Sequence, residues 1–285
     1  MDEMRKLTPE EFPRELLEIP DVPEHLYLRG ILPSPETTLL AIVGSRKYSS
    51  YGKDVCEELI AGLSGYDIAI VSGLALGIDS IAHQAALRAG LKTIAVPGSG
   101  LGKDVLYPAS NFHLAEKIVS EGGALLSEFE PDFKATVWSF PQRNRIMAGL
   151  SRAVLIIEAA ERSGTLITAR MALDYNRDVY VVPTSIFSES GKGSNALIRQ
   201  GAMPVLSSAD VLQELGFDIS QTEKAKTSPD YSDEEKNVLT LLKDPLGRDE
   251  LIRALAIETS KANMLLSVME IKGLIKEQWG VVHRR

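Results

Sequence analysis

Six short runs of aliphatic residues in the middle of the chain constrain its fold more than any other feature. Within each run the apolar residues follow one another without alternating with polar ones. Half-exposed strands alternate, whereas continuous apolar runs are typical of strands covered on both faces. The runs are LLAIVG from Leu39, IAIVSG from Ile68, KTIAVPG from Lys92, GALLSE from Gly123, AVLIIEA from Ala153 and DVYVVP from Asp178.

The segments between these runs have the spacing of amphipathic helices. Alternation of buried strands with helices predicts an α/β fold, with a parallel sheet that carries helices on both sides. Right-handed crossovers would make it an extended Rossmann-like, doubly wound sheet. The predicted helices are Lys53–Leu63, Asp79–Ala89, Ala109–Val119, Asn144–Leu150 and Thr165–Tyr175.

The sequence predicts four segments. Residues 1–37 are rich in proline and have one apolar island at Leu26–Leu28, so we expect an arm lying on the next domain. Residues 38–216 form the Rossmann-like domain, which ends with the helix SSADVLQEL and a stop at Gly216. Residues 217–231 contain few large aliphatic side chains and are typical of a linker, and 232–285 form a small second domain.

The last segment predicts a winged-helix-like domain, because three helical patterns precede the strand-like WGVVHRR. Acidic and basic residues balance in this segment. Its expected recognition helix, Ser260–Glu270, has only Lys261 as a base, whereas helices that read DNA need contacts to phosphates and base edges. A partner-binding or structural role is therefore at least as well supported as DNA binding.

The overall charge limits the kind of partner. A net charge of -8 and a pI near 5.2 argue against a surface that is positive all over, so contact with nucleic acid requires a local patch.

The single cysteine, Cys56, cannot form an internal disulfide. The N-terminus lacks the apolar stretch of a signal peptide, and no apolar run reaches the ~18 residues of a membrane helix. We therefore expect a cytoplasmic protein with no membrane association.

Glycine and small hydroxyl residues gather where the predicted strands end. They are Gly44, Ser45 and Arg46 after the first run, Ser72 and Gly73 after the second, Gly98 after the third, and Ser163, Gly164 and Thr165 before a helix. Because the carboxyl ends of parallel strands share one edge, these loops should meet in one crevice. Glycine admits a ligand close to the backbone, and helix N-termini attract phosphate. Turn formation alone is the alternative for any single loop, but four such loops on one edge favour a ligand site.

Common nucleotide motifs do not fit. A phosphate-binding loop at Gly102-Lys103 would have Pro97 in place of its first glycine and Asp104 in place of its hydroxyl residue. The alternating Gly98, Gly100 and Gly102 do not match the dinucleotide pattern and follow the third strand, not the first. An ATPase or a dehydrogenase is therefore disfavoured, and we expect no cofactor.

Catalytic and metal-binding patterns are also missing from the sequence. The histidines are His25, His83, His113 and His283. They have no C-x-x-C or H-E-x-x-H partner pattern, so we expect no metal site. Asp79 and His83 are spaced to share a helix face and could form an acid–base couple, but such pairs more often brace a helix. Cys56 lies in an amphipathic helix and is better interpreted as core.

The stretch FPQRNRI contains the strongest candidate ligands. Arg143, Asn144 and Arg145 would place two guanidinium groups beside free amides at a helix start, which suits a phosphate backbone. Ion pairs with nearby Glu128, Glu130 or Asp132 are the alternative, and we favour the ligand interpretation. Arg46 and Lys192 could add charge to the same edge. The hypothesis requires these cations to lie together and to be free of internal ion pairs.

Three aromatic residues lie near these cations. Trp138, Phe140 and Tyr107 could stack on bases, which contributes about 1–3 kcal/mol per base in single-strand binders. Burial in the core is the alternative, and it is the favoured interpretation for Trp138 and Phe140.

A series of strings in consistent order resembles the DNA-processing protein A family (DprA, also called Smf). They run from about Ala41 to Ala202 and include AIVGSRKYSSYG, IAIVSGLALGIDSIAHQAAL, KTIAVPGSG with YPASN, GGALLSEF, FPQRNRIMAGLS, VLIIEAAERSGTLITARMAL and NALIRQGA. The LYLRG string in the arm and MEIKGLI near the end are also similar to members of the family. Pro97 and VVPTS depart from the usual pattern at the crevice edge.

The resemblance implies a Rossmann-like protein, usually a homodimer, that binds single-stranded DNA without sequence preference. It also implies help in loading the RecA recombinase, cooperation with or displacement of single-strand-binding protein, and a role in recombination and natural transformation, with no catalytic activity. By the same resemblance, the Gly44–Arg46 loop, the Arg143–Arg145 segment and Lys192 would line the DNA groove.

Two other functions remain open. The SGT loop in EAAERSGTLITA also resembles the nucleotide loop of lysine-decarboxylase-like phosphoribohydrolases, but the chain lacks their Pro-Gly-Gly run and has Ala169 and Arg170 after Thr168. The third possibility is an interaction hub whose acidic surface and neutral C-terminal domain recruit a recombinase.

Overall fold

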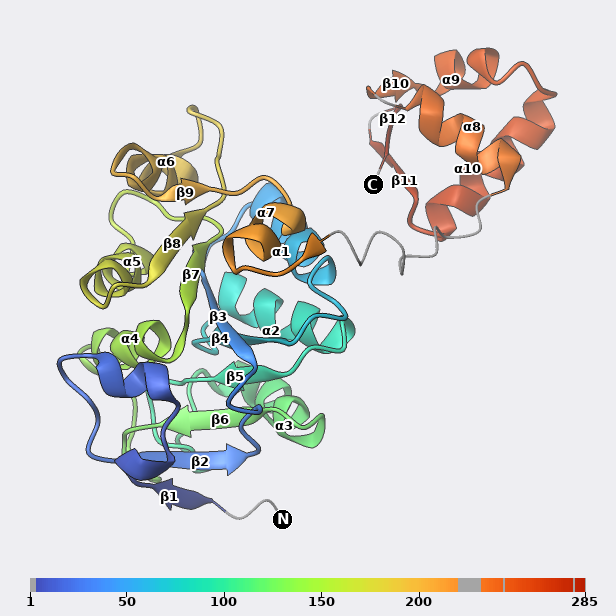
Figure 1. Cartoon of the computed structure of the whole chain (residues 1–285). Coiled ribbons are helices and arrows are strands. Elements are labelled where there is room, and N and C mark those ends of the chain that lie inside the picture. Colours follow the sequence, from blue (N-terminus) through green and yellow to red (C-terminus); the bar gives the residue numbers. More distant parts are fainter. Residues whose placement is uncertain (1–3, 220–231, 243, 279, 285) are drawn as a thin grey trace. The chain divides into compact units, whose positions relative to one another are not determined.

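The computed structural model describes residues 4–219, 232–242, 244–278 and 280–284. It separates into two compact units, Met1–Ile219 and Ser220–Arg285 (Figure 1). Most of the predicted linker, residues 220–231, lies outside the described residues.

The first unit is built on one nine-stranded sheet with the order β1-β2-β6-β5-β4-β3-β7-β8-β9. All six predicted strands are present in it, so the Rossmann-like fold is confirmed. The strands are β1 (Arg5–Leu7), β2 (Leu26–Gly30), β3 (Thr38–Val43), β4 (Ile68–Ser72), β5 (Thr93–Ala95), β6 (Ala124–Ser127), β7 (Ala153–Ile156), β8 (Asp178–Val181) and β9 (Met203–Pro204).

The six predicted strands are parallel to one another, as expected, and the additional strands β1 and β2 make the sheet mixed. From β6 to β9 the neighbouring strands are parallel, but β2 is antiparallel to β6 and β1 is antiparallel to β2. The expected N-terminal arm thus extends the sheet. Its apolar island supplies β2, and Leu26 and Leu28 are buried in the same core as the central strands.

Helices cover both faces of the sheet (Figure 1). Odd residues of β3, such as Ala41 and Val43, pack in one core with α4, α5 and α6, and even residues, such as Leu40 and Ile42, pack in a second core with α1, α2 and α7. This explains why the strands are apolar throughout. The helices are α1 (Ser50–Ala61), α2 (Ile78–Arg88), α3 (Phe112–Ser120), α4 (Ser139–Leu150), α5 (Thr165–Asp174), α6 (Lys192–Arg199) and α7 (Ser208–Glu214).

Helix α4 begins five residues before the predicted start at Asn144. The Oγ of Ser139 donates to the carbonyl oxygen of Gly98 and accepts from the backbone N–H of Thr136, which anchors the first turn. The prediction placed a helix start, with its free amides, at Arg143–Arg145. These residues instead lie inside the helix, where backbone amides bond to the preceding turn.

The chain reverses direction across the sheet between β3 and β7. From β3 it winds through β4 and β5 to β6, and it then returns to the other side of β3 for β7, β8 and β9. The loops that follow the neighbouring strands β3 and β7 therefore diverge to opposite faces and leave a crevice between them. This crevice is the place where the fold favours a ligand.

In its described residues, the second unit has three helices and a three-stranded sheet with the order β10-β12-β11, as expected for a winged helix. Its own core includes Val238, Leu251 and Leu266. Its elements are α8 (Asp233–Leu241), β10 (Leu246–Gly247), α9 (Arg248–Ala254), α10 (Thr259–Ile271), β11 (Ile275–Gln278) and β12 (Val281–Arg284). None of the helices in the described residues is long and apolar enough to cross a membrane.

The buried position of β2 predicts that the N-terminal segment stabilises the whole first unit. Replacing Leu28, which is 2 % exposed, with alanine should lower the free energy of unfolding by about 2–5 kcal/mol, because it leaves a cavity in the core. Urea unfolding of the full chain measures this change. Leu17→Ala is the control: this leucine is 45 % exposed, and its loss should cost well under half as much.

Candidate nucleic-acid interface

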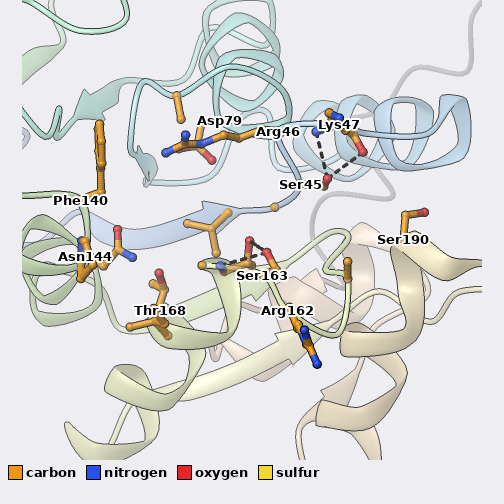
Figure 2. Close-up of a pocket in the computed structure, with 18 of the residues that line it drawn as sticks. Ser45, Arg46, Lys47, Asp79, Phe140, Asn144, Arg162, Ser163, Thr168 and Ser190 are labelled. Atoms are coloured by element: carbon orange, nitrogen blue, oxygen red, sulfur yellow. Dashed lines mark hydrogen bonds between the residues drawn. The ribbon is translucent and has the colours of Figure 1, made fainter. Parts of the chain in front are cut away.

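A pocket with a volume of about 700 Å³ lies at the carboxyl ends of β3 and β7 (Figure 2). Most of its lining comes from the loop after β3, the loop after β7 that leads into α5, and one face of α4. The segment after β4, with Ala75 and Asp79, and the segment before α6, with Glu189 and Ser190, complete it. Its volume is within the range of small-molecule sites, about 300–1,000 Å³. The pocket therefore occupies the crevice that the strand order creates.

The two loops supply six of the thirteen residues that the sequence analysis selected. Gly44, Ser45 and Arg46 line one side of the pocket. Ser163, Gly164 and Thr165 line the opposite side, where the Ser163 Oγ accepts from the Thr165 backbone N–H at 3.2 Å and shapes the turn into α5. These two loops therefore meet at one edge of the sheet, as expected.

One face of α4 forms the third wall. Phe140, Arg143, Asn144 and Met147 all line the pocket. Their spacing of three and four residues places them on the same side of a helix. An apolar ring, a cation, an amide and a thioether therefore point toward the same space.

Arg143 is buried and lies close to a buried carboxylate. Its Nη1 donates to the carbonyl oxygen of Val96, and Asp79 Oδ2 accepts from the backbone N–H of Gly73 at 3.1 Å. A Cβ at Gly73 would lie 1.9 Å from Arg143 Nη1 and 2.6 Å from Asp79 Oδ2, so a side chain at position 73 would displace one of these two groups.

Burial changes the titration of both groups. It lowers the pKa of Arg143 to about 10, although Asp79 opposes the change, and it raises the pKa of Asp79, although Arg143 opposes the change. Arg143 therefore remains charged at neutral pH and faces the pocket with Asp79 as its compensating neighbour.

The rim carries three further cations, Arg46, Lys47 and Arg162. Arg46 lies over the ring of Phe140, with its guanidinium carbon 5.2 Å from the ring centroid. Among the described residues, none of these three cations forms an ion pair within 4.0 Å. Unpaired positive charge is therefore available at the mouth of the pocket.

Carboxylates are also present, but several are already engaged. Glu158 accepts from the backbone N–H of Ser49 and from the Ser190 Oγ, which joins α1 to the loop before α6. Glu189 lines the pocket and pairs with Lys192 at 2.6 Å. Glu161 also lines the pocket and precedes Arg162 in the chain.

Arg145 forms ion pairs, which the sequence analysis gave as the alternative to a role as a DNA ligand. It is buried, its Nη2 donates to both carboxylate oxygens of Glu128 at 2.7 and 2.8 Å, and its Nε lies 3.3 Å from Asp21 Oδ2. Residues two apart on a helix point in nearly opposite directions, so Arg143 and Arg145 cannot both face the pocket. The preference for Arg145 as a DNA ligand is therefore not supported by its position.

Four other selected residues lie outside the lining of the pocket, and one of them, Gly73, lines the smaller cavity described below. Lys192 is held by Glu189 at the start of α6. Ser72 is buried, and its Oγ donates to the carbonyl oxygen of Ile42. Gly98 lies behind Phe140, where a Cβ would approach the ring to 2.6 Å. The required single cluster of free cations is thus only partly present.

The aromatic residues also differ from the favoured core interpretation. Phe140 forms a pocket wall, and Trp138 is 55 % exposed. Tyr107 is 47 % exposed and its ring centroid lies 5.7 Å from that of Phe140. Tyr107, Phe140 and Leu76 border a smaller cavity of about 30 Å³ next to Arg46 and Arg143.

Sequence reasoning missed Lys47, Arg162 and Thr168, which line the pocket. Two of them could have been found by adjacency, because Lys47 follows Arg46 and Arg162 precedes the Ser163 turn. Thr168 could have been found from helix periodicity, since it lies one turn after Gly164 and Thr165.

The possible acid–base couple of Asp79 and His83 does not form. His83 is fully buried, and its Nδ1 lies 2.7 Å from the Oγ1 of Thr93, which in turn donates to the carbonyl oxygen of Ile70. Burial lowers the pKa of His83 to about 3.

Cys56 is buried too, and burial raises the pKa of its thiol. No cluster of His, Cys, Asp and Glu suitable for a metal occurs in the described residues.

Comparison with known proteins gives consistent matches over both units. Residues 3–216 match the family DNA recombination-mediator protein A, and residues 222–280 match the DprA winged helix domain. The DNA processing protein DprA of Streptococcus pneumoniae is 45 % identical over 206 residues, which is 72 % of this chain and 72 % of that protein. Protein Smf of Escherichia coli is 39 % identical over 227 residues, 80 % of this chain. The matched region is about 60 % of the length of the Escherichia coli protein.

Solved structures lead to the same family. The X-ray structure of DNA processing protein A from Streptococcus pneumoniae superimposes with a TM-score of 0.68 at 40 % identity, covering 76 % of this chain and 75 % of that one. DNA processing protein A from Helicobacter pylori, described as having a unique single-stranded DNA binding mode, gives a TM-score of 0.65 at 32 % identity, covering 75 % of this chain and 98 % of that one.

Buried His83 predicts a loss of stability in weak acid. Its pKa is about 6.5 in the unfolded chain and is lowered in the folded protein, so below pH 6.5 the unfolded state binds a proton that the folded state cannot. The free energy of unfolding should therefore fall by about 1 kcal/mol more between pH 7 and 5.5 in the wild type than in His83→Gln. Urea unfolding at the two pH values tests this; equal losses would contradict it.

The Arg145 ion pairs predict a structural effect for this arginine. Arg145→Ala should lower the free energy of unfolding by about 3–5 kcal/mol, because the largely buried carboxylate of Glu128 loses its ion-pair partner and keeps only the hydrogen bond from Gln142. Arg5→Ala is the matched control, because Arg5 pairs with Glu11 in the open and its loss should cost less than about 1 kcal/mol. Thermal or urea unfolding distinguishes the two, and similar small losses would refute the structural role.

Proposed function

The chain belongs to the DNA recombination-mediator protein A family, and we propose that its first unit binds single-stranded DNA at the pocket beside β3 and β7. The strand's phosphates contact Arg46, Lys47 and Arg162 at the rim, together with the start of α5. Arg143 adds positive potential from within the wall. Support comes from the family, and from the described binding mode of the Helicobacter pylori protein.

One observation carries this proposal: unpaired cations surround a pocket in a chain whose net charge is -8. An acidic protein gains nothing from concentrating unpaired cations beside glycine loops unless they meet an anion. Phosphate is the anion that fits both the guanidinium groups and the helix start. The adjacent aromatic and apolar side chains suit the bases, so a single strand fits better than a duplex.

We also propose a biological role, which the family membership supports. The chain assists the loading of RecA recombinase onto single-stranded DNA, in recombination and in natural transformation, and acts beside single-strand-binding protein. It works as a homodimer in the cytoplasm. The neutral winged-helix domain, 232–285, serves as a partner-binding or structural module that the 217–231 segment joins to the Rossmann-like domain.

The chain acts as a binding protein and not as an enzyme. The matches of this chain in sequence and at high similarity in structure are to DNA processing proteins, so the phosphoribohydrolase alternative is not favoured. Incubation with nucleoside monophosphates, followed by a search for free base, tests that alternative directly.

Arg46→Ala should weaken binding of a single-stranded oligonucleotide about 10-fold or more at low salt, because a hydrogen bond to a charged group is lost. The slope of log affinity against log salt should fall by about 0.7 if one phosphate contact is removed. A fluorescence anisotropy titration at several salt concentrations measures both.

Arg88→Ala is the matched control, because it also removes one positive charge from an arginine. Arg88 is the last residue of α2, does not line the pocket, and pairs with Glu57. It should leave both affinity and slope nearly unchanged. Equal effects of the two substitutions would show that only the overall charge matters, and would count against the proposed site.

A further inference from the structure

Helix α10 of the second unit carries an exposed apolar stripe. Met264 is 72 % exposed, Val268 39 % and Ile271 86 %. Lys261 precedes them and is also exposed. The four residues are separated by three, four and three positions, so they lie along one side of the helix. Large apolar side chains that gather on one exposed helix face are typical of an interaction surface.

The opposite side of α10 packs in the core of the second unit. Ala262, Leu266 and Met269 are buried there, together with Val238 of α8 and Leu251 of α9. The apolar residues of the stripe neither form this core nor border it. The fold of the second unit therefore does not account for them.

The stripe is poorly suited to DNA, although α10 is the expected recognition helix of the winged helix. Helices that read DNA need contacts to phosphates and base edges, and the stripe offers one cation among apolar side chains. Two neighbouring cations are already engaged, because Arg248 pairs with Glu277, and Lys272 pairs with Glu235 at 2.6 Å. An apolar surface with this little free charge favours a protein partner.

The spacing of the stripe is that of a coiled-coil seam. Residues separated alternately by three and four positions occupy the a and d sites of a heptad, where they pack into a facing helix. Met264 and Ile271 take the a sites, and Lys261 and Val268 take the d sites. The spacing is the same when it is reversed, so two antiparallel copies of α10 match, with a opposite d and the two chains related by a two-fold axis. Met264 of each chain then lies opposite Val268 of the partner subunit.

Lys261 distinguishes the two directions in which the helices could pair. In a parallel pair the two copies of Lys261 would face each other and repel. In an antiparallel pair Lys261 lies beside Ile271 of the partner subunit, which is the last residue of α10. The carbonyl groups at a helix C-terminus carry partial negative charge, which favours a cation. Among the described residues, Lys261 forms no ion pair within 4.0 Å, so its charge is available for this contact.

We propose that α10 of one chain pairs in antiparallel fashion with α10 of a second chain through this stripe. The inference rests on the partner-binding role proposed for the winged-helix domain, and it identifies the surface and the partner. It does not depend on DNA binding. The contact is small, because α10 has 13 residues and is about 20 Å long. A pair of such helices buries less surface than a standard stable interface, so we expect association that depends on protein concentration.

Disulfide trapping is the first test. The only cysteine, Cys56, is buried, so an introduced thiol is the one that solvent reaches. Full-length Lys261→Cys and Ile271→Cys chains, with tags of different length, are mixed and oxidised. The antiparallel pair places residue 261 of one chain opposite residue 271 of the other, whereas two copies of either residue lie about 15 Å apart along the helices, too far for a disulfide. We expect a mixed disulfide dimer and little dimer from either variant alone.

Substitution of Met264 is the second test. Met264→Lys puts a charge in the middle of the stripe at an exposed position, so the domain should stay folded. In sedimentation equilibrium of the full chain without DNA, it should raise the dissociation constant of the association about 10-fold or more, as expected when a central contact of an interface is lost. Asn237→Lys is the matched control, because it adds the same charge at an exposed residue of α8. Its dissociation constant should equal that of the wild type.

The outcomes separate this inference from the proposed function. A mass that does not rise with concentration, with no disulfide between residues 261 and 271, would overturn the pairing and assign the stripe to a different protein. Disulfides that form as readily in each variant alone as in the mixture would overturn the antiparallel arrangement. Equal effects of Met264→Lys and Asn237→Lys would show that added charge, and not the stripe, controls association. Binding of single-stranded DNA is measured separately in the anisotropy titrations, so either proposal can fail while the other stands.

Discussion

The reversal of strand order between β3 and β7 is the constraint on which the site depends. Two neighbouring parallel strands send their following loops to opposite faces of the sheet, so the space above their ends is left open. The glycine and hydroxyl residues after each strand border this space, and α4 closes its third side. The pocket is thus a product of chain topology, and its residues come from segments more than a hundred positions apart.

Helix α4 serves two purposes because its two sides face different surroundings. The side with Phe140, Arg143 and Asn144 lines the pocket. The side with Arg145 is held by Glu128 and by Asp21 of the N-terminal segment. An ion pair that fixes the helix from behind keeps the pocket side in a constant position. The N-terminal segment, which also adds β1 and β2 to the sheet, therefore supports the site without reaching it.

Charge is distributed within the site according to exposure. The cation that is buried, Arg143, has Asp79 near it, which offsets part of the cost of removing a guanidinium from water. The cations that need no such neighbour, Arg46 and Lys47, lie at the open rim. An acidic protein can in this way present a local positive surface to a polyanion, because contacts over a few ångströms matter more than a screened net charge.

Much of this protein follows from local sequence patterns. Continuous aliphatic runs predict buried parallel strands, and glycine-rich loops after them predict a crevice at one sheet edge, because both depend on neighbouring residues and on general rules of chain geometry. The direction in which a side chain points, and the partner it meets, depend on where an element begins and on distant segments. An error of five residues in the start of α4 placed Arg143 and Arg145 together at a helix end, whereas the helix places them on opposite sides. Likewise, no local pattern shows that Glu128 and Asp21 hold Arg145, or that Asn144 and Thr168 line the same pocket. Those facts are set by packing between residues far apart in the chain, and therefore only the tertiary structure decides them.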